Sequence, residues 1–242
     1  AGWPADAGVV ERLAANPNIR DLSMTTNGVL LEKQAESLRS AGLDRVTVSL
    51  DTLRPERFKE LTRRDCLPQV LEGIDAAVES GLKPLKINTV VMRGYNDDEL
   101  TDMIDFARDG GAEVRFIEYM PLDAQHKWEM NKVLPAKKIL EGLSRAGELE
   151  LVRDNPHNPA TKYRYKDGKG EVGVIPTVTE PFCATCNRIR LTADGMIRTC
   201  LFSTVEHDIK SHLRGGADDE TIKEWLAGVV LTKTPGHLIG QK

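Results

Sequence analysis

Several features that mark specialised classes of protein are missing from this sequence. It has no continuous apolar run of about eighteen residues, so no segment predicts a membrane-spanning helix. The formal net charge is −4, which does not favour a dedicated nucleic-acid binder. The first residues resemble neither a secretory leader nor an Arg-rich transit peptide. What remains is an ordinary globular composition of 242 residues, 40% hydrophobic and 29% charged, which is enough for a full core.

Cysteine is scarce, and three of the four cysteines are clustered near the C-terminal end. Cys183 and Cys186 form a Cys-x2-Cys pair, and Cys200 follows after thirteen intervening residues. Cys66 stands alone and is predicted to be an ordinary surface or core residue. This distribution argues against a disulfide framework and favours a reducing compartment inside the cell. The clustered spacing is typical of a metal site.

Two kinds of metal site are compatible with this spacing. A structural zinc ion takes four protein ligands, and the nearest candidates for the fourth are His207 and His212. A cubane iron–sulfur cluster held by only three cysteines leaves one iron free to bind a substrate atom. The spacing alone leaves both interpretations open.

Two arginines directly follow the Cys-x2-Cys pair. Arg188 and Arg190 are two residues apart, so on an extended segment they point to the same face. Guanidinium groups beside a metal site predict an anionic substrate. The alternative is a solvated strand face that binds nothing.

The first half of the chain alternates short apolar runs with helical patterns. We expect strands at residues 19–24, 45–50, 86–92 and 114–119, and helices at residues 31–40, 55–62, 67–80 and 97–109. This order predicts parallel strands joined by helical crossovers. Four strands cannot close a barrel, so the sheet is either open and doubly wound or part of a (β/α) barrel.

Polar segments follow the predicted strands, at the edge where such folds keep their chemistry. They comprise residues 25–28, 49–52, 92–94 and 118–121. Each also has a purely structural explanation. Residues 25–28 suit a turn, Ser49 and Asp51 suit helix capping, and Met120 suits core packing.

The pattern changes beyond residue 121. A helix is expected at residues 136–146, followed by short strands at 149–153, 162–166 and 171–178 and by helices near 207–214 and 220–231. Turns at residues 167–170 and 192–195 predict hairpins. We therefore expect two domains: residues 1–121 with the βα units, and residues 122–242 as a small antiparallel extension that carries the cysteines.

Together these segments resemble one family. The similarity is carried by residues 25–28, 46–52, 88–100 and 115–121 and by the segment Phe182-Cys183-x2-Cys186-Asn187-Arg188-x-Arg190, with Cys200 downstream. They resemble the GTP 3′,8-cyclases, radical S-adenosylmethionine enzymes of molybdenum-cofactor biosynthesis. The likeness runs from residue 17 to residue 240 without a large gap.

The resemblance implies an α/β fold, an incomplete parallel (β/α) barrel of the radical S-adenosylmethionine type, followed by a C-terminal antiparallel extension that carries an iron–sulfur cluster. It implies a lyase that converts GTP to (8S)-3′,8-cyclo-7,8-dihydroguanosine 5′-triphosphate. In that family an N-terminal 4Fe-4S cluster cleaves S-adenosylmethionine to a 5′-deoxyadenosyl radical, which takes a hydrogen from the ribose 3′ position. A second 4Fe-4S cluster holds GTP through its open iron.

Carried over residue by residue, the resemblance implies three groups of site residues. The implied ligands of the substrate-binding cluster are Cys183, Cys186 and Cys200. The implied GTP contacts are Thr25, Lys86, Arg188 and Arg190. The implied S-adenosylmethionine contacts are Ser49 and Met120. No individual catalytic residue is assigned.

The partners implied by the resemblance are GTP and S-adenosylmethionine, with no nucleic acid. It leaves a homodimer open and implies that the product passes to cyclic pyranopterin monophosphate synthase. The expected location is the cytoplasm of a bacterium or the mitochondrial matrix of a eukaryote.

Two family motifs are not found in the sequence, the N-terminal Cys-x3-Cys-x2-Cys and the C-terminal Gly-Gly tail. We therefore expect the C-terminal two thirds of such an enzyme, with a second cluster only in the full-length protein. By itself this part is expected to hold GTP without cleaving S-adenosylmethionine. The alternative is a non-catalytic zinc- or nucleotide-binding module derived from that enzyme.

Overall fold

The computed structural model describes residues 7–122, 128–153, 155–168, 170–234 and 236. The chain divides into two compact units, each considered by itself. The first unit comprises Ala1–Asp154 and Ala160–Thr179, and the second comprises Asn155–Pro159 and Glu180–Lys242. Within the described ranges, no helix has the length and apolar character needed to cross a bilayer.

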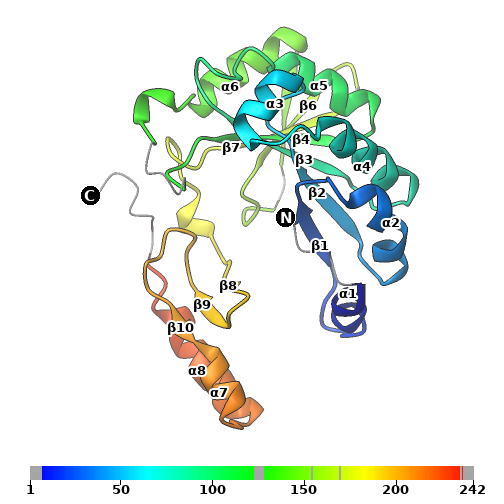
Figure 1. Cartoon of the computed structure of the whole chain (residues 1–242). Coiled ribbons are helices and arrows are strands. Elements are labelled where there is room, and N and C mark those ends of the chain that lie inside the picture. The colour runs from blue at the N-terminus through cyan, green and yellow to red at the C-terminus, as the bar shows by residue number, and fades with distance from the viewer. Residues whose placement is uncertain (1–6, 123–127, 154, 169, 235, 237–242) are drawn as a thin grey trace. The chain divides into compact units, whose positions relative to one another are not determined.

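A seven-stranded sheet organises the first unit (Figure 1). Its strands, in spatial order, are β1 (Ser23–Thr26), β2 (Arg45–Ser49), β3 (Lys86–Val91), β4 (Glu113–Glu118), β7 (Glu171–Ile175), β6 (Thr161–Tyr165) and β5 (Leu149–Val152). Neighbours from β1 through β7 are parallel, and the β7–β6 and β6–β5 pairs are antiparallel. The unit is therefore mixed α/β with a mainly parallel sheet, as the βα alternation predicts.

Helices connect the parallel strands. The helical segments of the first unit are α1 (Ala7–Ala14), α2 (Leu31–Ser40), α3 (Pro55–Thr62), α4 (Leu67–Glu79), α5 (Leu100–Asp109), η1 (Met130–Lys132), α6 (Ala136–Leu143) and η2 (Ser144–Ala146). The predicted bounds of α2 and α3 are confirmed. The start of α5 differs, because Asn96 accepts a hydrogen bond from Met92 and Asp97 accepts one from Gly94, which holds residues 92–97 in turns. α1 was not predicted.

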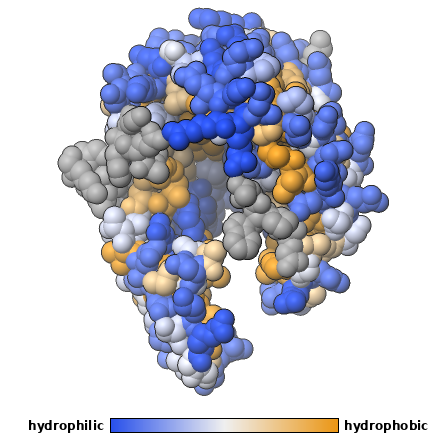
Figure 2. Space-filling model, in the orientation of Figure 1, coloured by the Kyte–Doolittle hydropathy of each residue, from blue (hydrophilic) through white to orange (hydrophobic). Residues whose placement is uncertain are grey.

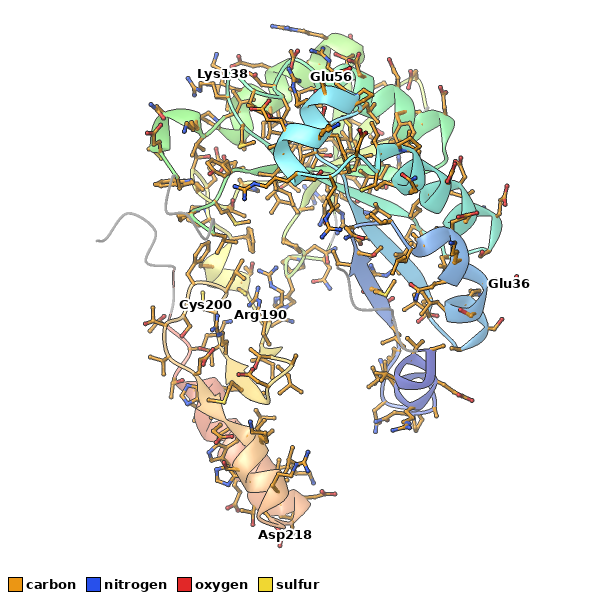
Figure 3. All side chains as sticks on the ribbon, in the orientation of Figure 1. Glu36, Glu56, Lys138, Arg190, Cys200 and Asp218 are labelled. Atoms are coloured by element: carbon orange, nitrogen blue, oxygen red, sulfur yellow. The ribbon has the colours of Figure 1, made fainter. Side chains whose placement is uncertain are left out.

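The hydrophobic core of the first unit lies between the sheet and its helices. Strand residues such as Val48, Ile87 and Phe116 are fully buried, and so are helix residues such as Leu38 and Ile74. The outer surface of these helices is mainly hydrophilic (Figure 2). Glu36, Glu56 and Lys138 lie on this outer side (Figure 3). One face of the sheet is thus covered by amphipathic helices, as the helical periodicity predicts.

The strands between residues 149 and 175 do not form a separate extension. β7 pairs in parallel with β4, from Val114 opposite Val172 to Ile117 opposite Ile175. The hairpins β5–β6 and β6–β7 therefore complete the sheet of the first unit. The division between the compact units falls after Thr179, whereas the sequence analysis expects a domain boundary at residue 121. Local patterns do not reveal this pairing, because β4 and β7 are far apart in the sequence.

The second unit contains a small antiparallel sheet and two helices. Its elements are η3 (Cys183–Thr185), β8 (Arg190–Leu191), β9 (Met196–Arg198), β10 (His207–Asp208), α7 (Ile209–Arg214) and α8 (Asp219–Leu231). The predicted turn at residues 192–195 is confirmed, since Gly195 donates to the carbonyl of Thr192 between β8 and β9. Asp208 and Asp218 cap α7 and α8 through their side chains.

Candidate functional site

Polar side chains are aligned on the face of the sheet opposite the helices. Residues paired across parallel strands point to the same side, because side chains alternate along each strand. One row across the strands contains Thr25, Thr47, Lys86 and Glu113. The next row contains Ser49, Asn88, Arg115, Gly173 and Lys162. We call the side chains of these two rows the polar face.

The polar face brings together three of the predicted site residues in the first unit. Thr25 and Lys86, the implied GTP contacts, lie in one row with Thr47 between them. Ser49, an implied S-adenosylmethionine contact, lies in the neighbouring row at the end of β2. Met120 follows the end of β4, so it also lies at the carboxyl edge of the parallel strands.

Lys86 is the most deeply buried cation of the polar face, with 8% of its surface exposed. Burial and the positive charge of Arg115 lower the pKa of the Lys86 ammonium to about 8. Glu113 offsets part of this charge, since it accepts a hydrogen bond of 2.9 Å from Arg115 Nε and lies 3.4 Å from Lys162 Nζ. The two rows of the polar face therefore gather three cations, Lys86, Arg115 and Lys162, near Glu113, a composition suited to an anionic ligand.

Asn88 and Arg115 are candidate site residues that the sequence analysis missed. Asn88 Oδ1 is buried and has no hydrogen-bond partner among the described residues. A buried polar atom without a partner costs free energy, so a ligand donor at this position would stabilise it. The available signal was the alternation of polar residues along 86–92, which could be interpreted only once the strand register was known.

The loops at the carboxyl edge are held by buried polar groups. The Glu118 carboxylate accepts hydrogen bonds from the backbone amides of Ala136 at 2.7 Å, Val178 at 2.7 Å and Thr179 at 2.8 Å. Glu118 has no exposed surface. It therefore connects the end of β4, two residues before Met120, to the start of α6 and to the segment after β7.

Asp51 is a half-buried carboxylic acid at the same edge. Its side chain accepts a hydrogen bond of 2.8 Å from the Val90 amide, and Asn96 Nδ2 donates to its backbone carbonyl at 2.7 Å. Burial raises the pKa of Asp51 to about 6, although the bond from Val90 acts in the opposite direction. Asp51 thus joins the loop after β2 to β3 instead of capping a helix.

The segment at residues 25–28 forms a turn that packs closely on the core. Gly28 adopts φ +80°, and its amide donates to Thr26 Oγ1. A Cβ at position 28 would lie 3.0 Å from Val70 and 3.1 Å from Val48. The glycine is therefore required for structural reasons, whether or not Thr25 contacts a ligand.

In the second unit, Cys183 and Cys186 lie at the two ends of one 3-10 turn. The Cys186 amide donates to the Cys183 carbonyl at 3.2 Å. Arg188 points back at this turn, with Nε 3.4 Å and Nη2 3.2 Å from Cys186 Sγ and its guanidinium carbon 4.8 Å from the centre of the Phe182 ring. Burial opposes ionisation of Cys186, but the hydrogen bonds and charge of Arg188 lower its thiol pKa to about 7.

Arg190 and Cys200 belong to opposite strands of the β8–β9 hairpin or to the segment that directly follows. Cys200 follows β9 and lines a cavity of about 300 Å³ together with Phe202, Val205 and His207. Arg190 (Figure 3) begins β8 opposite Arg198, and its side chain forms no hydrogen bond or ion pair with other described residues. His212, the other zinc candidate, stacks on Trp225 at 4.8 Å between ring centres.

The three clustered cysteines of the second unit are the cluster ligands implied by the family resemblance. None of the three thiols is in a disulfide bond, and all three are half-buried. Among the residues that the structure describes, no three Cys, His, Asp or Glu side chains are gathered closely enough to hold one metal ion. A cubane binds its cysteines through different iron atoms, so its ligands lie farther apart than those of a single ion.

Comparisons with known proteins find relatives that match most of the chain. A curated relative named GTP 3′,8-cyclase from Streptomyces coelicolor is 50% identical over 221 residues, which cover 90% of this chain and 65% of that protein. One named GTP 3′,8-cyclase 3 from Mycobacterium bovis is 43% identical over 225 residues, covering 91% of this chain and 59% of that protein. The chain thus spans about 60% of the length of these curated relatives.

The solved structure of TYW1 with a lysine-pyruvate adduct bound is 19% identical, with a TM-score of 0.42, and the alignment covers 56% of this chain and 44% of that one.

Residues 4–107 match the Radical SAM superfamily model. Residues 112–239 match the model described as Molybdenum Cofactor Synthesis C. Since this second match covers more than half of the 242 residues, the chain belongs to the Molybdenum Cofactor Synthesis C family.

Proposed function

We propose that this chain is the GTP-binding part of a GTP 3′,8-cyclase of molybdenum-cofactor biosynthesis. The intact enzyme would convert GTP to (8S)-3′,8-cyclo-7,8-dihydroguanosine 5′-triphosphate by radical S-adenosylmethionine chemistry. Relatives that carry this name are 50% and 43% identical to the chain. The first unit would then be part of a (β/α) barrel, and the second unit the extension that holds a cluster.

The observation that carries the proposal is the strand register of the polar face. In this register Thr25 and Lys86 lie in one row, and Arg115 and Lys162 lie in the next. A triphosphate requires several fixed cations, and a buried lysine whose pKa is lowered gains an interaction partner when an anion binds. Lys86 would therefore bind phosphate, and Thr25 would donate a hydroxyl hydrogen bond to the same ligand.

The second unit contains the remaining implied GTP contacts and the implied cluster ligands. Cys183, Cys186 and Cys200 would hold a 4Fe-4S cluster, which when bound offers an open iron position to the substrate. Arg190, which has no partner among the described residues of this unit, is free to bind phosphate. Arg188 already lies against Cys186, so its first role would be to stabilise the thiolate.

S-adenosylmethionine would contact the carboxyl edge of the sheet. Ser49 at the end of β2 offers a hydroxyl group, and Met120 after β4 offers an apolar surface. Asp51 and Glu118 would hold the two loops that carry these residues. The reaction product would pass to cyclic pyranopterin monophosphate synthase.

Calorimetric titration with GTP and with guanosine tests the proposal. Lys86→Met should weaken GTP binding at least tenfold and change guanosine binding little, because only the phosphates are anionic. Lys59→Met is the matched control, since Lys59 is an exposed lysine of α3 paired with Asp65. No measurable GTP binding by the unsubstituted chain, or equal losses for GTP and guanosine, would contradict the proposal.

A further inference from the structure

Lys233 bonds to both of the segments that carry the clustered cysteines. Its ammonium Nζ donates a hydrogen bond of 2.8 Å to the carbonyl of Arg188 and one of 2.5 Å to the carbonyl of Thr199. Arg188 is two residues after Cys186, and Thr199 immediately precedes Cys200. One side chain beyond the end of α8 therefore connects two segments that are separate in the sequence.

The two carbonyls lie just outside the β8–β9 ladder. The last paired residues of that hairpin are Arg190 and Arg198, so backbone pairing ends before the cysteines are reached. Beyond this point, nothing in the ladder holds the Cys186 segment beside the Cys200 segment. An ammonium group carries three donors, and here it supplies the cross-connection that the strands do not.

Lys233 is also suited to this position by its surroundings. It is half-buried, and Thr199 is almost fully buried, so the bond to Thr199 is shielded from water.

We propose that Lys233 is a positioning residue that holds the Cys200 segment against the Cys183–Cys186 turn, so that the three thiols can bind one cluster. This inference rests on the proposed function, because it assumes that the three thiols share a ligand. The Lys233 ammonium group bonds to backbone carbonyls and not to a thiol. Its effect passes through the backbone carbonyls of Arg188 and Thr199.

Backbone amide hydrogen exchange on the metal-free full chain tests the connection without any cluster. In Lys233→Met, peptides that cover residues 183–190 and 198–203 should exchange at least fivefold faster, while α4 in the first unit should be unchanged. Lys233→Arg, which retains several donors, should restore slow exchange. Lys223→Met is the matched control, because Lys223 lies exposed on α8 and is paired only with Glu220.

The second measurement is iron and sulfide content after anaerobic reconstitution of the same variants. Lys233→Met should take up less than half of the iron and sulfide of the unsubstituted chain. Lys233→Arg and Lys223→Met should take up nearly as much iron and sulfide as the unsubstituted chain. Exchange and uptake unchanged in Lys233→Met would overturn the inference, and so would faster exchange throughout α8, which would indicate a general loss of structure. If the unsubstituted chain takes up no iron, the cluster proposal fails, whereas the exchange result still decides whether Lys233 holds the two segments together.

Discussion

The guanidinium of Arg188 lies against the sulfur of Cys186, with Nη2 3.2 Å from Sγ. Arg188 Nε also lies 3.4 Å from this sulfur, so two of the guanidinium nitrogens that the family resemblance assigns to GTP already have a partner. Arg190, two residues later, has no partner among the described residues of its unit. The two arginines of one short motif therefore have different surroundings and are expected to have different roles.

The first prediction separates these two roles. Arg190→Ala should weaken GTP binding by about 1.5–3 kcal/mol, the contribution of a charge-assisted hydrogen bond, with a smaller effect on guanosine. Arg188→Ala should in addition reduce iron uptake, because it removes the hydrogen bonds to Cys186. Arg214→Ala, an exposed arginine in the last turn of α7, is the control. A full retention of GTP affinity in Arg190→Ala, measured by calorimetry, would show that Arg190 does not bind phosphate.

The second prediction concerns the thiols. Replacing Cys183, Cys186 or Cys200 singly by Ser should abolish stable cluster assembly, since each change leaves only two of three thiolate ligands. Iron and sulfide analysis after anaerobic reconstitution measures the effect. Cys66→Ser should reconstitute normally, because Cys66 precedes α4 and packs against the core of the first unit. Normal iron and sulfide in any of the three clustered variants would remove that cysteine from the ligand set.

The third prediction uses the raised pKa of Asp51, about 6 against an ordinary value of 3.8. The folded protein holds this proton more tightly than the unfolded chain, so the Asp51 contribution to stability falls as the pH rises through this interval and then levels off. Asp51 should change the free energy of unfolding by at most about 1.4 kcal/mol per pH unit.

Asp51→Asn removes this contribution while the amide oxygen still accepts from Val90. Urea unfolding at pH 4 to 7 should therefore show a flatter pH dependence and a higher free energy of unfolding at pH 7 than in the unsubstituted chain. Asp75→Asn, on the exposed side of α4, controls for the loss of one charge. A steeper pH dependence in Asp51→Asn would contradict the assignment.

The fourth prediction concerns Glu118. Glu118→Leu should lower the free energy of unfolding of the first unit by at least about 3 kcal/mol, because three backbone amides lose their acceptor in a buried site. Glu129→Leu provides the control, since Glu129 is exposed and paired only with Lys132. Equal unfolding midpoints in urea for the two variants would mean that Glu118 does not hold the edge of the sheet together.

The sequence by itself determined the elements that depend on local chemistry. The helices at residues 31–40 and 55–62 and the turn at 192–195 match the structure, because amphipathic periodicity and turn residues act over a few neighbouring positions. The spacing of Cys183, Cys186 and Cys200 predicts a cysteine-based site in the same way, and this site stays a prediction. The family resemblance depended on the same local motifs.

Only the tertiary structure decided which of these elements meet. The parallel pairing of β4 with β7 moved residues 149–175 into the sheet of the first unit, and the strand register aligned Thr25 with Lys86. Lys233 reaches the carbonyl of Thr199 from a segment 34 residues away. Such contacts depend on the packing of the whole unit and on hydrogen bonds between distant backbone groups, and no local pattern specifies a partner at that distance.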